Sequence, residues 1–172
     1  MTDSDHRIIA ERVDLVPLTV EDAEEMAEVL GGEELYSFIG GTPPTPEALR
    51  IRYAKLVTGG PGDGSQDWYN WIIRRRPDGK AVGTVQATVD GGGRHAEVAW
   101  VVGLAWQRQG YASEAAKALV AWLDSHGVTR IDAHVHPDHE ASGAVARRAG
   151  LVPTDAFQYD ERRWTRRRPA RT

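Results

Sequence analysis

The pattern of hydrophobic and polar positions predicts one strand and two helices in the first 60 residues. The apolar run "VDLVPL" is typical of a strand, which we expect over about residues 8–17. Thr19 is a good helix N-cap, and the apolar spacing that follows is helical until the Gly-Gly pair at 31–32. The segment from residue 45 repeats this design, with Thr-Pro at its start and Gly-Gly at 59–60.

Alternating apolar residues then predict an antiparallel meander of three strands at "WYNWIIRRR", "KAVGTVQATVD" and "HAEVAWVV". The Asp-Gly of "PDGK" is a hairpin signal between the first two. An apolar stripe from Gln109 to His126 predicts a long helix. A strand ("RIDAHVH"), a helix ("DHEASGAVARRAG") and one or two final strands ("LVPTDAFQYDERRWTRR") follow. The helical crossover from "HAEVAWVV" to "RIDAHVH" predicts that these two strands are parallel.

These elements predict an α/β fold in a single domain over residues 1–172. Its order is strand, helix, helix, three strands, helix, strand, helix and two strands. The simplest packing is a mixed sheet of about six to seven strands with helices on both faces. We expect residues 1–7 and 169–172 to be frayed ends.

Composition narrows the function classes. The net charge of −4 argues against general nucleic-acid affinity. The chain has no cysteine, which excludes a disulfide, a thiolate nucleophile and a thiolate metal site. No apolar run approaches the ~18 residues of a membrane helix, and the N-terminus is too polar for a signal peptide, so we expect a cytoplasmic protein. The arginines of "ERRWTRRRPART" fit a solvated edge strand better than a binding tail.

The segment "WQRQGYASEA" carries the first chemical signal. It lies between a predicted strand and a predicted helix, where backbone amides lack partners and face the positive end of the helix dipole. Gly110 lets an anion approach the backbone closely, and Gln107 and Arg108 add side-chain donors. The spacing by itself leaves an ordinary helix start as the alternative.

The Gln-x-x-Gly-x-Ala pattern of this segment resembles motif A of the Gcn5-related N-acetyltransferases (GNAT), Gln/Arg-x-x-Gly-x-Gly/Ala. "VDLVPLTVEDAEEMAEVL", "AEVAWVVGLAWQRQGYASEA" and "VHPDHEASGAVARRAGLVPT" are similar to the subgroup that acetylates ribosomal-protein N-termini. The resemblance covers roughly residues 15–154. It implies a GNAT-like fold, acetyl-CoA as co-substrate and no metal.

The resemblance also implies a cofactor site. The acetyl-CoA pyrophosphate would rest on backbone amides in motif A, and the pantetheine arm would pair with the strand before it. The implied positions are Val101, Val102, Leu104, Gln107, Arg108, Gln109, Gly110, Tyr111, Ala112 and Ser113.

Candidate catalytic residues follow from the same comparison. Glu97 is the candidate base, working through a water, and His95 is a weaker one; a cross-strand ion pair is the alternative for Glu97. Ser142 would hydrogen-bond the CoA sulfur, unless it is a plain helix-start hydroxyl. His139 stands at the family's asparagine position and is expected to contact the cofactor. In many family members a tyrosine acts as the general acid, and Ala146 stands at its position here. Alanine cannot donate a proton.

The binding site for the amine that accepts the acetyl group, here called the acceptor side, is less defined. Tyr36, Phe38 and Trp71 are expected to line it, with core packing as the alternative for each aromatic residue. Tyr159 and Trp164 could face the same cleft or a homodimer partner. His134 and His136 share a strand face but lack an evident third ligand, so we expect no metal site.

The sequence therefore predicts an acetyl-CoA-dependent N-acetyltransferase. It would move an acetyl group to a primary amine by direct attack in a ternary complex, with a protein or peptide N-terminus favoured over a small amine. Two alternatives remain open. One is a non-catalytic acyl-CoA-binding sensor module, and the other is a toxin-like enzyme that acetylates aminoacyl-tRNA.

Overall fold

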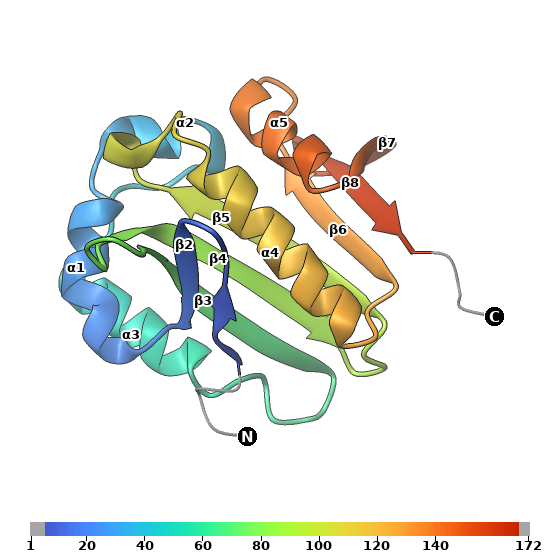
Figure 1. The fold of residues 1–172 in the computed structure, drawn as a ribbon, viewed down its shortest axis with the longest axis horizontal. Coiled ribbons are helices and arrows are strands. Elements are labelled where there is room, and N and C mark those ends of the chain that lie inside the picture. Colours follow the sequence, from blue (N-terminus) through green and yellow to red (C-terminus); the bar gives the residue numbers. More distant parts are fainter. Residues whose placement is uncertain (1–5, 169–172) are drawn as a thin grey trace.

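A mixed sheet of eight strands with helices on both faces is the framework of this protein (Figure 1), in a computed structural model that describes residues 6–168. The order across the sheet is β1-β2-β3-β4-β5-β6-β8-β7. The strands are β1 (Ile8–Ile9), β2 (Val13–Pro17), β3 (Gln66–Arg75), β4 (Ala81–Asp90), β5 (His95–Val102), β6 (Arg130–Val135), β7 (Val152–Gln158) and β8 (Glu161–Arg167). The α-helices are α1 (Ala23–Val29), α2 (Tyr36–Ile39), α3 (Pro46–Leu56), α4 (Tyr111–Ser125) and α5 (Glu140–Arg148), with 3₁₀ turns η2 (Val20–Asp22), η3 (Glu33–Leu35) and η4 (Leu104–Trp106).

The predicted α/β order is confirmed, and the predicted strand count of six to seven is too low. The single strand expected at residues 8–17 is two strands, because the chain turns back between them. The Ala10 N–H donates to the Val13 carbonyl at 2.9 Å, and Ile8 then pairs with Leu15 in an antiparallel ladder. The final segment also forms two strands. No sequence pattern predicted α2, a single helical turn.

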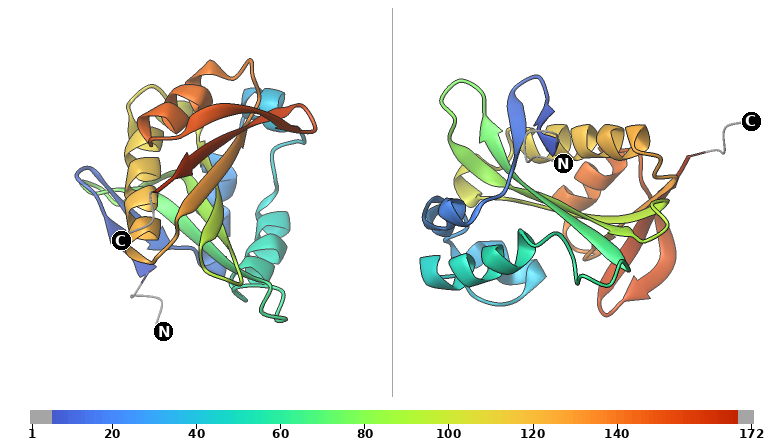
Figure 2. Two further views of the ribbon diagram at one scale, coloured as in Figure 1. Left: turned by 90° about the vertical axis from the view of Figure 1, so that its right-hand side faces the viewer. Right: turned by 90° about the horizontal axis from the view of Figure 1, so that it is seen from below.

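Two hydrophobic cores lie on opposite faces of the sheet. The larger core is under α4, where Leu119 and Leu123 pack with the strand residues Val98 and Ile131. The smaller core joins α1 and α3 to β3 and contains Met26, Leu49 and Ile72. The right-hand view of Figure 2 shows α4 on one side of the sheet and α1 and α3 on the other. The prediction of helices on both faces is therefore confirmed.

The central strands β5 and β6 are parallel, as predicted, but they pair over only three positions. The register runs from His95–Arg130 to Glu97–Asp132. Beyond Glu97, β5 stays paired with β4 as far as Val102, whereas β6 stays paired with β8 over residues 130–135. Because each strand follows a different neighbour, a wedge opens between β5 and β6.

The buried carboxylate of Asp132 fixes the closed end of this wedge. It accepts hydrogen bonds from the Thr165 hydroxyl at 2.6 Å, from Arg130 at 2.7 Å and from His95 Nε2 at 3.0 Å. These partners come from β8, β6 and β5, so one side chain joins three strands where the wedge begins.

Part of the segment expected to fray is held to the body of the protein. The His6 carbonyl accepts a 2.6 Å hydrogen bond from the Trp71 indole, and Arg7 forms a 3.0 Å salt bridge with Asp14. Residues 1–5 and 169–172 lie outside the described part of the chain. No helix within residues 6–168 is long and apolar enough to cross a membrane.

Candidate active site

The loop between β5 and α4 curves into a backbone cradle of the kind that can bind an anion. Arg108 and Gly110 both have positive φ, at 63° and 83°, and Gly110 is the N-cap of α4. In general, successive backbone N–H groups in such a turn, followed by a helix N-terminus, form a concave surface that attracts anions. A Cβ at Gly110 would lie 3.0 Å from the Arg12 guanidinium, so there is little room for a side chain.

Arg12, in the turn between β1 and β2, forms hydrogen bonds that hold this loop in place. Its Nη1 donates to the Gln109 carbonyl at 2.9 Å, and its Nε donates to Glu114 Oε1 at 2.8 Å. Glu114 Oε2 also accepts from the backbone N–H groups of Arg12 and Val13, at 2.7 and 3.0 Å. Burial acts to raise the pKa of Glu114, but these hydrogen bonds outweigh it and hold the pKa below its ordinary value.

A groove of about 570 Å³ runs from this loop along the end of β5 and beneath α5. It is lined by Leu35, Trp100, Val101, Val102, Trp106, Gln107, Arg108, Gly110, Tyr111, Ala112, Ser113, His139, Glu140, Ala141, Ser142, Ala144, Val145 and Arg148. All the predicted cofactor residues except Leu104 and Gln109 line this groove. The Gln107 amide is already engaged, because its Nε2 donates to the Val102 carbonyl at 3.1 Å. The backbone carbonyl of Gln109 is likewise held by Arg12.

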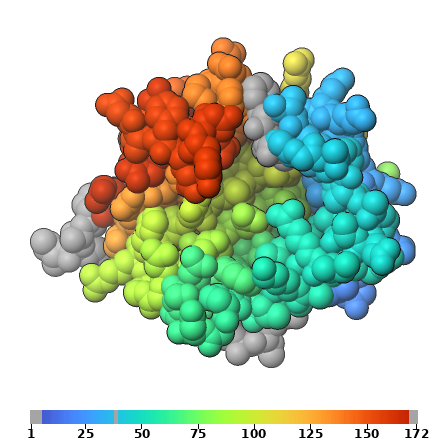
Figure 3. All heavy atoms as spheres, turned by 180° about the vertical axis from the view of Figure 1, so that it is seen from behind, coloured from blue at the N-terminus to red at the C-terminus, as the bar shows by residue number. Residues whose placement is uncertain are grey.

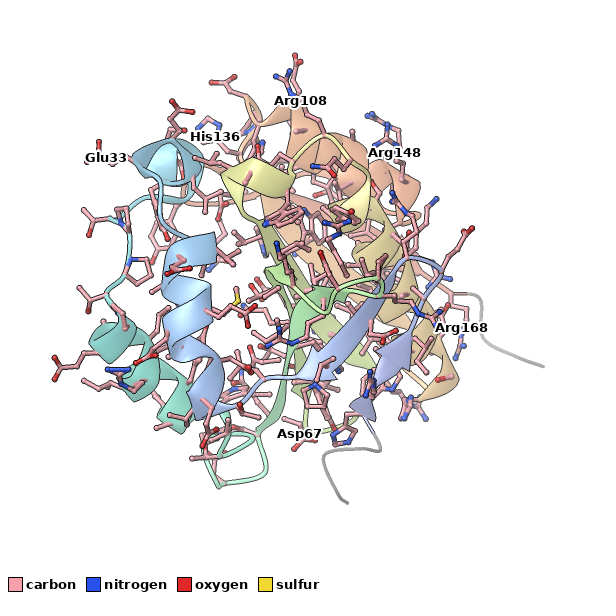
Figure 4. The ribbon with its side chains drawn as sticks, turned by 60° about the vertical axis from the view of Figure 1, so that its left-hand side comes forward. Glu33, Asp67, Arg108, His136, Arg148 and Arg168 are labelled. Carbon is pink, nitrogen blue, oxygen red and sulfur yellow. The ribbon has the colours of Figure 1, made fainter. Side chains whose placement is uncertain are left out.

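The groove also contains a cation that the sequence analysis missed. Arg148, near the end of α5, donates from Nη1 to the Ser113 hydroxyl at 3.3 Å, beside the first turn of α4. Figure 4 shows Arg108 and Arg148 at the end of the molecule opposite Asp67. The periodicity of α5 placed Arg148 on a helix, but it could not show which neighbour the side chain meets.

A second cavity of about 250 Å³ lies in the wedge between β5 and β6. It is lined by Glu97, Val98, Ala99, Trp100, Val101, Ala133, His134, Val135, His136, His139, Ser142 and Glu161. Four residues, Trp100, Val101, His139 and Ser142, also line the groove, so the two spaces meet there. Figure 3 shows the surface hollowed between the C-terminal strands and the segment around α2 and α3.

Acidic and imidazole groups face this second cavity. Glu97 is half exposed, and its Oε1 lies 2.9 Å from His134 Nδ1 across the wedge. Burial is the main reason that the pKa of Glu161 is raised, and nearby Asp160 and Glu97 act in the same direction while His134 and His136 oppose it. Sequence analysis missed Glu161, because its strand could not be aligned with β6 by pattern alone.

His95 is less suited to act as a base. Its Nδ1 lies 2.8 Å from Asp90 Oδ2, and its Nε2 lies 3.0 Å from the buried Asp132. Both ring nitrogens therefore have carboxylate partners. Within residues 6–168, no three His, Cys, Asp or Glu side chains are grouped so that they could hold a metal ion.

Ser142 and His139 lie together at the start of α5. His139 Nδ1 accepts the Ser142 backbone N–H at 3.4 Å, and the Ser142 hydroxyl accepts the Trp100 indole N–H at 3.1 Å. Burial, with a smaller contribution from His136, lowers the pKa of His139 and so favours its neutral form. Ala146 is fully buried in the core under α5.

The residues expected at the acceptor side are separated by the structure. Trp71 is 1% exposed and packs against Trp122, with 5.2 Å between ring centroids, so it belongs to the core under α4. Tyr36 donates its hydroxyl to the Leu30 carbonyl at 2.9 Å. The backbone of Phe38 is in α2, but its side chain lies outside the described part of the structure.

The two late aromatic residues also have different environments. Trp164 is buried, with the Arg147 guanidinium 5.3 Å from its ring centroid. Tyr159, in the turn between β7 and β8, is 93% exposed. Of these two residues, Tyr159 is therefore the one with an exposed ring.

A sequence profile of the acetyltransferase (GNAT) domain matches residues 12–152. The chain belongs to the GNAT acetyltransferase family. Comparison with curated proteins gives no match. The membership confirms that this protein is classed with acyltransferase enzymes, as the motif A resemblance implied.

Solved structures share the fold of this GNAT protein at low sequence identity. RimL, a ribosomal L7/L12 alpha-N-protein acetyltransferase in complex with coenzyme A, has a TM-score of 0.80 and 16% identity, covering 95% of this chain and 98% of that one. The ribosomal-protein-S5-alanine acetyltransferase of Vibrio fischeri has a TM-score of 0.76 and 17% identity, covering 94% and 96%. The microcin C7 self-immunity acetyltransferase MccE, in complex with acetyl-CoA and AMP, has a TM-score of 0.77 and 16% identity, covering 91% and 93%.

Proposed function

We propose that this GNAT protein is an acetyl-CoA-dependent N-acetyltransferase that acetylates a primary amine by direct attack in a ternary complex. The observation that carries this proposal is the junction of the groove and the second cavity at Trp100, Val101, His139 and Ser142. A donor that enters along the groove and an acceptor that enters through the cavity would meet there without passing each other. Holding two reactants together in this way is itself a large part of catalysis.

The groove suits acetyl-CoA, which supplies the activated acetyl group when bound. Its volume is in the range of sites for small molecules and cofactors. The cradle at residues 108–113 offers amides to a pyrophosphate, and Arg108 and Arg148 add positive charge. Beyond Glu97, no strand within residues 6–168 pairs with the edge of β5 that faces the wedge, so this edge can pair with an extended pantetheine arm.

The second cavity suits an amine. The carboxylates of Glu97 and Glu161 favour a cation, and Glu97 is placed to take a proton from it, directly or through a water. His139 and Ser142 lie at the junction itself, where they line both spaces. An N-terminal amine, with a pKa near ~8, needs less help to lose its proton than a lysine at ~10. Together with the activities named for RimL and the Vibrio fischeri enzyme, this favours a protein or peptide N-terminus over a small amine.

Calorimetry followed by a thiol-release assay tests the proposal. Acetyl-CoA should bind, and thiol release should require an amine. Three matched acceptors separate the substrate classes: a peptide with a free N-terminus and no lysine, the same peptide with a blocked N-terminus and one lysine, and a polyamine. We expect release with the first peptide above all.

Each other outcome identifies an alternative. Binding without turnover on any amine would favour the acyl-CoA-binding sensor, and release only with aminoacyl-tRNA would favour the toxin-like enzyme. No binding at high micromolar acetyl-CoA would overturn the proposal. The cytoplasmic location and a homodimer remain predictions, and sedimentation analysis would test the second.

A further inference from the structure

The Trp100 indole and the Ser142 hydroxyl meet where the cofactor groove joins the second cavity. The indole Nε1 donates to Ser142 Oγ at 3.1 Å, and both residues line both spaces. Trp100 belongs to the part of β5 that has separated from β6, and Ser142 is in the first turn of α5. This hydrogen bond therefore spans the open end of the wedge.

The direction of this hydrogen bond decides what the serine can do. An indole N–H can only donate, so Ser142 Oγ is the acceptor, and its own hydrogen is left to point elsewhere. Other hydroxyls near helix ends donate a hydrogen bond to the backbone carbonyl three residues earlier. Ser37, Thr58 and Ser125 do so at 2.7–2.8 Å. Within residues 6–168, no comparable bond donated by Ser142 is present.

We infer that Trp100 is a positioning residue that aims the Ser142 hydroxyl at the sulfur of the acyl donor. This inference rests on the proposed function. By occupying an Oγ lone pair, the indole fixes the serine rotamer and leaves the O–H to be donated into the junction. A hydroxyl that accepts one hydrogen bond also donates more strongly, by roughly 10–30% in condensed-phase estimates.

The chemistry at the sulfur does not need a stronger acid. The amine lone pair forms the new C–N bond, and the C–S bond breaks with its electron pair going to sulfur. The amine proton passes to Glu97 or to water and then to the thiolate or the solvent. Ser142 keeps its proton and only donates a hydrogen bond, which suffices because a thiol has a pKa of ~8.5. This explains how the site could work with Ala146 at the tyrosine position.

A binding experiment without turnover tests whether Trp100 and Ser142 act together on the CoA sulfur. The affinities of CoA and of desulfo-CoA, which lacks the sulfur, are compared by calorimetry in each variant. Wild type should favour CoA by roughly fivefold, the size of one hydrogen bond. Trp100→Phe and Ser142→Ala should each lose most of this preference, and the double variant should lose no more. Trp122→Phe, a change at a tryptophan outside both spaces, should keep it.

Kinetics then separates positioning from a structural role. In the wild-type background, Trp100→Phe should lower kcat roughly fivefold to tenfold. The KM for acetyl-CoA should stay within about twofold of the wild-type value. In a Ser142→Ala background, the same change should have no further effect on kcat, because the partner is already gone.

Three results would overturn the inference: additive losses in the double variant, a Trp100→Phe effect confined to KM, or a Ser142→Ala variant with the wild-type rate. Failure of the proposed function is distinguishable from these results. A wild-type protein that binds CoA but never releases thiol would overturn the enzyme assignment, and the desulfo-CoA comparison would still decide whether Trp100 and Ser142 contact the sulfur.

Discussion

Arg12 and Glu114, 102 positions apart in the sequence, form a salt bridge of 2.8 Å between Nε and Oε1. It ties the turn between β1 and β2 to the first turn of α4. Because Arg12 also donates to the Gln109 carbonyl, the pair fixes the loop that would hold the cofactor phosphates. The Glu114 carboxylate, through Arg12, thus connects the turn between β1 and β2 with the loop of the candidate site.

Glu114→Gln should destabilise the protein in a pH-dependent way. The folded-state pKa of Glu114 is lowered, so its contribution is fully present above the unfolded-state pKa of about 4.5 and is lost as the pH falls through the folded-state value. At pH 7 the free energy of unfolding should fall by about 1–2 kcal/mol. Denaturant titrations at several pH values measure this. Glu28→Gln, on the exposed side of α1, is the control, and a Glu114→Gln deficit that is unchanged at pH 3 would contradict the argument.

Gly110→Ala should weaken acetyl-CoA binding by roughly tenfold or more, about 1.4 kcal/mol. The left-handed backbone and the crowding against Arg12 both oppose a Cβ there, beside the proposed phosphate site. Gly127→Ala is a matched control at the other end of α4, with φ of 88°. Apart from its two chain neighbours, no atom of the described residues lies within 4 Å of the new Cβ. Both variants should lose about 1 kcal/mol of stability from backbone strain. Equal affinity for acetyl-CoA in the two variants would place the phosphates elsewhere.

Arg148→Gln should lower the affinity for acetyl-CoA by roughly fivefold and reduce its salt dependence, because one cation at the groove is removed. Calorimetry at two ionic strengths measures both effects. Arg167→Gln removes the same charge from an exposed position on β8, outside the groove, and should leave binding unchanged. An equal loss in both variants would mean that only the overall charge matters.

Glu97→Gln should reduce turnover by roughly 10²-fold near neutral pH, the scale of general base catalysis. Acetyl-CoA affinity should stay the same, because Glu97 lines only the second cavity. The deficit should shrink as the pH rises toward ~9, where a peptide N-terminus has already lost its proton in solution. Steady-state rates across pH 6–9 would show this, with Glu28→Gln as control. A wild-type pH profile in Glu97→Gln would remove Glu97 from proton transfer.

The resemblance to motif A, carried by local sequence, predicted the residues of the cofactor side. The strand, the polar loop and the Ala-rich helix around Gly110 are adjacent in sequence, and their geometry depends on nearby backbone conformations. Local signals also predicted the order of helices and strands, with two exceptions: the single turn of α2, and the turn at Ala10, whose short hairpin has no strong turn residues. The burial of Trp71 in the core under α4 could not be predicted for a different reason. Strand alternation shows that a residue changes face, but it does not show which face a helix covers.

The sequence by itself determined the order of most elements and the parallel crossover, because periodicity, caps and glycine conformations act over a few residues. Its resemblance to motif A predicted the anion cradle. Only the tertiary structure decided that β6 follows β8 instead of β5, which opens the wedge. It also decided that Arg12, Trp100 and Arg148 reach the loop, Ser142 and Ser113. These relationships depend on side-chain direction and on contacts between distant segments, and both are set when the sheet and its helices pack together.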